Sequence, residues 1–153
     1  MNQSNSALRP ILLYAVIPAV AALLSVQLAC DKIMFWRKGP QPMESASNVP
    51  ASEGTVKATL GDNGNTNLAL RVKHLAPPFK LQADATVYVV WLQQQDQPKQ
   101  NIGALTLNKN LEGSLDIVTP FRRFSITVTP EPGGQVDQPS HEAVFTASVD
   151  RKD

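Results

Sequence analysis

The sequence is poor in cysteine and histidine, and this shortage excludes several chemistries. Its single cysteine, Cys30, precedes the region that has the pattern of a folded domain, so no disulfide can staple that domain. A blue-copper site needs a cysteine thiolate and two histidines inside one fold, and this region offers only His74 and His141. We therefore predict no metal site and no cofactor.

An excess of charge of one sign is also missing. Residues 55–153 contain ten lysines and arginines and ten aspartates and glutamates, so this part of the chain is formally neutral. A protein that neutralises many phosphates needs a basic face, and no basic run or stripe is present. Nucleic acid is therefore not expected as a partner.

Motifs that carry catalysis are absent as well. The sequence has no glycine-flanked nucleophile, no glycine-rich phosphate loop and no calcium-loop spacing. Ser140 and His141 are adjacent, and a strand would point them to opposite faces, while Glu131 falls in a loop region where carboxylates are usually solvated. No catalytic residue is predicted. The alternative is a small exported hydrolase or ligand-binding protein with its site on the loop of residues 130–141.

One long stretch without charge is present near the start of the sequence. Residues 11–29 carry no charged side chain and follow Arg9. A helix of this length reaches about 28 Å, close to the hydrocarbon thickness of a bilayer. The stretch also has the basic lead, the apolar centre and the small or polar end of a secretory signal. Residues 1–30 are therefore predicted to be a signal peptide or a membrane anchor.

The end of this stretch, Leu28-Ala29-Cys30, resembles a bacterial lipobox, in which a lipoprotein precursor is cut before a cysteine that is then acylated. The pattern prefers leucine three residues before the cysteine, where this chain has Gln27. Two interpretations stay open, lipid attachment at Cys30 and an uncleaved signal anchor. We predict a location in the bacterial cell envelope, with the domain outside the cytoplasm and with the lipid bilayer and an unidentified envelope protein as partners. Lys32, Arg37 and Lys38 follow the apolar stretch, so an uncleaved anchor leaves open a domain that faces the cytoplasm.

The composition changes again after the apolar stretch. Residues 39–54 have the sequence GPQPMESASNVPASEG, with three prolines and few large apolar side chains. Such a composition favours an extended tether with little to bury. We predict a linker over residues 31–54 and one domain over residues 55–153, which is enough chain for a single core.

A period-two alternation of apolar and polar residues through residues 55–153 predicts β-strands. In one example Phe124, Ile126 and Val128 alternate with serine and threonine. Residues 85–92 are apolar on both faces, as expected of a strand covered on each side. Turn signals such as Asn63-Gly64 separate the runs. The sequence therefore predicts about seven strands and no helix. The strands are expected over residues 55–60, 66–75, 85–94, 101–108, 111–118, 122–129 and 143–150.

Antiparallel strands of this number bury their apolar faces by stacking or closing. The predicted fold is therefore all-β, an immunoglobulin-like antiparallel β-sandwich that follows an N-terminal hydrophobic helix. We expect Trp91 to fill the centre between the sheets. The expected structural core contains Tyr88, Trp91, Phe124 and Phe145.

Several segments together resemble the extracytoplasmic C-terminal domain of anti-sigma-K-type factors. They are HLAPP (74–78), TVYVVWL (86–92), NIGAL (101–105) and FSITVTPEPGG (124–134), followed by QPS (138–140). That family places a β-sandwich outside the membrane after one transmembrane helix, with a cytoplasmic helical domain ahead of it that holds the sigma factor.

This chain offers only residues 1–10 in the place of that helical domain. The resemblance therefore implies the fold and the membrane-tethered setting, and it does not imply that the chain sequesters a sigma factor. The expected function is non-catalytic, in protein interaction, envelope sensing or structure.

Overall fold

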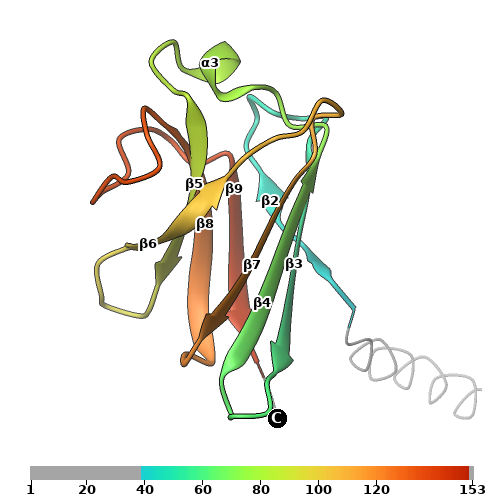
Figure 1. Cartoon of the computed structure of the whole chain (residues 1–153), viewed down its shortest axis with the longest axis vertical. Coiled ribbons are helices and arrows are strands. Elements are labelled where there is room, and N and C mark those ends of the chain that lie inside the picture. Colours follow the sequence, from blue (N-terminus) through green and yellow to red (C-terminus); the bar gives the residue numbers. More distant parts are fainter. Residues whose placement is uncertain (1–38, 152–153) are drawn as a thin grey trace, which may run out of the picture. The chain divides into compact units, whose positions relative to one another are not determined.

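The computed structural model describes residues 39–151 of the chain (Figure 1). The predictions for residues 1–30, including lipid attachment at Cys30, and for the first part of the linker lie outside the described residues. Within residues 39–151 no helix is long and apolar enough to cross a membrane.

The prediction of an all-β fold is confirmed, because the chain forms two antiparallel sheets. One sheet has the strand order β1-β3-β4-β7 and the other has β2-β9-β8-β5-β6. The strands are β1 (Gln41–Pro42), β2 (Glu44–Ser45), β3 (Glu53–Leu60), β4 (Thr66–Lys73), β5 (Val87–Gln93), β6 (Gln100–Leu105), β7 (Gly113–Thr119), β8 (Arg123–Glu131) and β9 (Phe145–Asp150). Within residues 39–151 they number nine rather than about seven, and one helical turn, α3 (Pro78–Leu81), was not expected.

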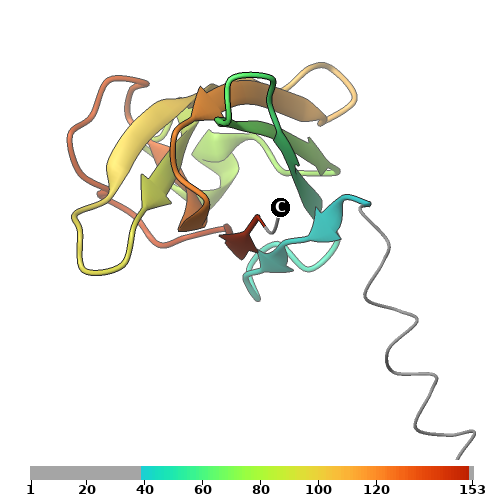
Figure 2. The same cartoon turned by 90° about the horizontal axis from the view of Figure 1, so that it is seen from below.

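The two additional strands come from the segment predicted to be a tether, and the compact unit begins at Gly39 rather than at residue 55. β1 pairs with β3 and β2 pairs with β9, so this short segment joins the edges of both sheets (Figure 2). Met43 N donates to Gly54 O at 2.8 Å, and Met43 and Val49 are buried. Strand pairing with both sheets and the burial of two apolar side chains therefore hold the segment on the core.

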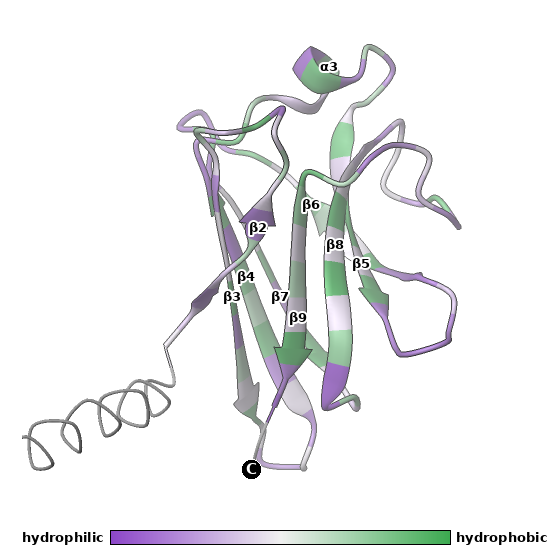
Figure 3. Cartoon of the chain, turned by 180° about the vertical axis from the view of Figure 1, so that it is seen from behind, coloured by the Kyte–Doolittle hydropathy of each residue, from purple (hydrophilic) through white to green (hydrophobic). Residues whose placement is uncertain are grey.

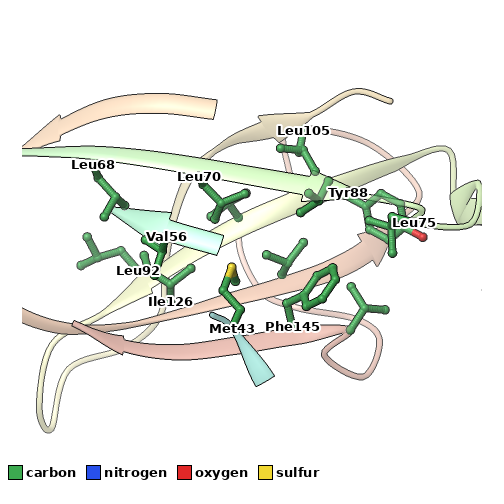
Figure 4. Packing of buried hydrophobic residues seen from close by; sticks show 14 of the residues in the cluster. Met43, Val56, Leu68, Leu70, Leu75, Tyr88, Leu92, Leu105, Ile126 and Phe145 are labelled. Carbon is green, nitrogen blue, oxygen red and sulfur yellow. The ribbon is translucent and has the colours of Figure 1, made fainter. Parts of the chain in front are cut away.

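The core lies between the two sheets and is built by the predicted alternation (Figure 4). Figure 3 shows apolar and polar residues alternating along β8. Tyr88, Phe124 and Phe145 are buried in this core. The Tyr88 hydroxyl donates to Ala76 O at 2.6 Å, and burial raises the pKa of Tyr88 above its ordinary value.

Trp91 is fully buried, but it does not fill the centre between the sheets. The core contains Tyr88, Val90 and Leu92 from β5, so strand alternation turns Trp91 to the opposite face of its sheet. A loop, residues 132–143, lies over that face. It is held there by Asn101, which is paired with Trp91 and donates to Gly134 O and Val136 O, at 3.0 Å in each case.

Candidate functional site

The outer face of the larger sheet carries a buried chain of hydrogen bonds that begins at Trp91. Alternation along β8 places Thr129 and Glu131 on the same face as Trp91. Trp91 Nε1 donates to Thr129 Oγ1 at 2.8 Å, and the Thr129 hydroxyl donates to Glu131 Oε1 at 2.6 Å. All three side chains are buried, and Glu131 has no exposed surface.

The Glu131 carboxylate is the centre of this arrangement. Ser140 N donates to both carboxylate oxygens, at 3.1 Å and 3.2 Å, and the Ser140 hydroxyl donates to Oε2. A buried carboxylate is costly unless hydrogen bonds satisfy it, and here the loop supplies them. The expectation of a solvated loop carboxylate is therefore wrong for Glu131, which is the last residue of β8.

His141 extends the arrangement to the segment that precedes β5. Its Nδ1 lies 3.1 Å from Ser140 Oγ and 3.8 Å from Glu131 Oε2, while its Nε2 lies 3.2 Å from Asp84 Oδ1. Ser140 and His141 lie in a loop rather than in a strand, so their side chains meet although the residues are adjacent. We call this set of side chains the Glu131 cluster. It consists of Asp84, Trp91, Thr129, Glu131, Ser140 and His141.

The order serine, histidine, aspartate in this cluster resembles the arrangement of a nucleophile, a base and a residue that orients the base. The hydrogen bonds favour another role. Ser140 donates its hydroxyl and its backbone N–H to Glu131, and Thr129 donates its hydroxyl to the same carboxylate. The cluster thus ties the end of the loop to the sheet that the loop covers.

Two further contacts hold the beginning and the middle of the same loop. Thr86 Oγ1 donates to Pro132 O at 2.7 Å, next to the point where β8 ends. Asn101 binds the middle of the loop by donating to Gly134 O and Val136 O. Asn101 lies beside a bulge in β6, where the register with β5 shifts and Gly103 has a φ of 146°. Polar contacts therefore fasten the loop along its whole length.

The remaining candidate residues do not join this site. His74 follows the last residue of β4 and has a left-handed conformation with a φ of 54°, and its carbonyl accepts from Ser52 Oγ at 3.0 Å. In the described part of the chain, no three histidine, cysteine, aspartate or glutamate side chains gather as metal ligands would. Sequence analysis missed Asp84, Asn101 and Thr129. The threonines that alternate along β8 up to Glu131 were the available signal for a covered polar face.

Comparisons of the chain with protein-family models, with curated proteins and with solved structures found no match. The resemblance to the anti-sigma-K extracytoplasmic domain rests on the segments quoted above and stays a prediction.

Proposed function

We propose that this chain is an exported, membrane-tethered, non-catalytic domain of the bacterial cell envelope that acts in protein interaction, envelope sensing or structure. The observation that carries the proposal is the order of parts along the chain. A charge-free stretch over residues 11–29 is followed by a self-contained all-β unit that begins at Gly39, nine residues after Cys30. A stretch of this length is sufficient to span a bilayer or to direct export.

The strand order supports an immunoglobulin-like sandwich. β3, β4 and β7 lie in one sheet and β5, β6, β8 and β9 in the other, and the chain changes sheets after β4, after β6 and after β7. Crossovers of this Greek-key kind join the two sheets of immunoglobulin-like domains. Antibody domains pack a tryptophan between their sheets, whereas Trp91 faces away from the core. The proposed similarity to immunoglobulin-like domains is therefore one of strand order and connection. The anti-sigma-K resemblance implies the same sandwich.

The Glu131 cluster supports the non-catalytic part of the proposal. The backbone N–H of a nucleophilic serine often helps to stabilise the oxyanion of acyl transfer. In this chain the N–H of Ser140 donates to Glu131 instead. The same carboxylate receives the Ser140 hydroxyl, so both groups stabilise the fold.

The tether is tested by the intact mass of the protein recovered from bacterial membranes. We expect membrane-bound protein with one of two masses, either that of residues from Cys30 onward plus acyl chains or that of the full unlipidated chain. The control is Cys30→Ala, which removes the acylated species and leaves a full-length anchor unchanged. Recovery of a soluble, unacylated fragment that starts after residue 30 would contradict the proposal.

A small hydrolase is the second candidate, because Ser140 Oγ lies 3.1 Å from His141 Nδ1 and His141 Nε2 lies 3.2 Å from Asp84. A fluorophosphonate probe distinguishes the two functions, since it forms a covalent bond with an activated serine. The non-catalytic proposal predicts that the probe leaves the mass of the native chain and of the Ser140→Ala variant unchanged. Labelling of the native chain that Ser140→Ala abolishes would establish the hydrolase instead.

A further inference from the structure

The four sheet edges of this fold differ in how they are protected. β1 and β2 are two residues long, and β1 contains Pro42. β6 carries the bulge at Gly103. β7 is seven residues long and has neither a proline nor a lysine, and its ladder in the described structure is with β4. Natural sheets usually blunt such an edge because it is a template for another strand.

The backbone of β7 presents two amides at this edge. Residues of an antiparallel ladder direct their N–H and C=O groups alternately to one neighbour and to the other. The hydrogen bonds from Gly61 N to Asn65 O and from Met43 N to Gly54 O fix which residues of β3 face β4. Followed along the ladders to β7, this alternation directs the N–H and C=O groups of Gly113, Leu115, Ile117 and Thr119 toward β4. The N–H groups of Asp116 and Val118 therefore point to the open edge, whereas Ser114 lies beside the bridge that joins Gly113 to Leu107.

Incompletely buried apolar side chains gather on the same side of the molecule. The segment from β1 to Ser52 closes one side of the sandwich (Figure 2). On another side Leu107, which follows β6, forms a bridge with Gly113 of β7. A Cβ on Gly103 would lie 3.2 Å from Leu115 Cδ1, so the two strands touch there. The apolar side chains of β6, of β7 and of the segment between them that pack on the core but stay partly exposed are Ile102, Leu107, Leu115 and Ile117.

We propose that the edge of β7 binds an extended segment of a partner protein, which adds to the sheet as a further strand. This inference rests on the proposed interaction function and names its surface. Every second side chain of the added strand would be apolar and cover Leu115 and Ile117, and the others would face solvent beside Asp116 and Val118.

The charges on the outer face restrict the solvent-facing residues of the partner. Arg71 donates to both carboxylate oxygens of Asp116, at 2.7 Å and 2.9 Å, and its guanidinium lowers the pKa of that carboxyl group. Asp116 thus stays ionised, so a neutral or basic residue suits the opposite position and an acidic one is disfavoured. A second copy fits less well, because two β7 edges in full antiparallel overlap would place the two Asp116 carboxylates opposite each other.

The test uses a labelled peptide with the sequence of residues 66–73, TNLALRVK, because β7 already pairs with that sequence as β4. It has the required alternation, with leucine and valine on one face and neutral or basic residues on the other. Fluorescence anisotropy with the full-length chain is expected to show saturable binding. Val118→Pro should weaken this binding by about tenfold or more, because proline removes one edge donor. The matched control Val118→Thr keeps the amide and should bind as the native chain does.

Val118 is 62% exposed and its amide points away from β4, so proline there leaves the β4 ladder intact. A second measurement uses only native protein, in case the variant does not fold. N-methylation of the peptide at Ala69, on its polar face, should abolish binding, whereas N-methylation at Leu70 should not. Equal binding by Val118→Pro, or no saturable binding at all, would overturn the proposal.

Two further results separate this inference from the alternatives. A concentration-dependent dimer that sedimentation detects for the native chain, and that Val118→Pro abolishes, would assign the edge to a second copy and overturn the partner proposal. Failure of the peptide test together with the expected mass from membranes would remove the β7 site and leave the proposed tethered role standing.

Discussion

Replacing Trp91 with alanine is expected to lower the free energy of unfolding by about 3–5 kcal/mol. The side chain is fully buried between its sheet and the 132–143 loop, so truncation leaves a cavity. It also removes the donor to Thr129 at 2.8 Å. Domains of this size are stable by only about 5–15 kcal/mol, so the variant should unfold at a markedly lower denaturant concentration. Denaturation followed by far-UV circular dichroism measures the change.

The Trp91→Phe variant is the control for the size of this effect. Phenylalanine keeps much of the apolar contact and lacks the indole N–H, so its loss of stability should be clearly smaller. A loss below about 1 kcal/mol for Trp91→Ala would mean that the loop opens readily over this face, because most of the transfer and cavity cost would then be missing.

The position of Trp91 shows how far the sequence alone could be interpreted. Alternation establishes that Val89 and Trp91 face one side of β5 while Tyr88 and Val90 face the other. Because both sets are apolar, the pattern cannot tell which side meets the second sheet. The answer depends on a loop that returns to β5 from about forty residues further along the chain, and such a contact leaves no periodic signal.

The seven longer strands, in contrast, were predictable within a few residues. Their side chains alternate because one face of each sheet meets the core, and turn residues such as Asn63-Gly64 mark the ends. β1 and β2 were missed because two residues are too few for a period to be visible. They are held by their partners β3 and β9, so the information for them lies elsewhere in the sequence.

The Glu131 cluster was predictable only as a set of residue names. Glu131, Ser140 and His141 all stood in the loop of the alternative hydrolase, but a carboxylate near prolines and glycines usually faces water. Its burial follows from the register of β8, which places it beside Val87 on the covered face of the sheet. Ser140 lies nine positions after Glu131, and the loop between them determines whether the two meet.

Replacing Glu131 with alanine is expected to destabilise the domain by about 3 kcal/mol, the order of magnitude of losing hydrogen bonds to a buried charged group. Removing the carboxylate relieves the cost of burying its charge. That gain is outweighed because Ser140 N–H, the Ser140 hydroxyl and the Thr129 hydroxyl all lose their acceptor. The loop should loosen over Trp91, so in a Trp36→Phe background the Trp91 emission should shift to longer wavelength.

Two matched variants separate the contributions to this loss. Ser140→Ala removes one hydroxyl and keeps the backbone N–H bond, so it should cost less than Glu131→Ala. Glu131→Gln keeps the volume but turns an amide donor toward the donors of Ser140, so it should also destabilise. If the two residues act through each other, the double variant Glu131→Ala/Ser140→Ala should cost less than the sum of the single changes. Additive losses with unchanged Trp91 emission would show that the carboxylate does not hold the loop.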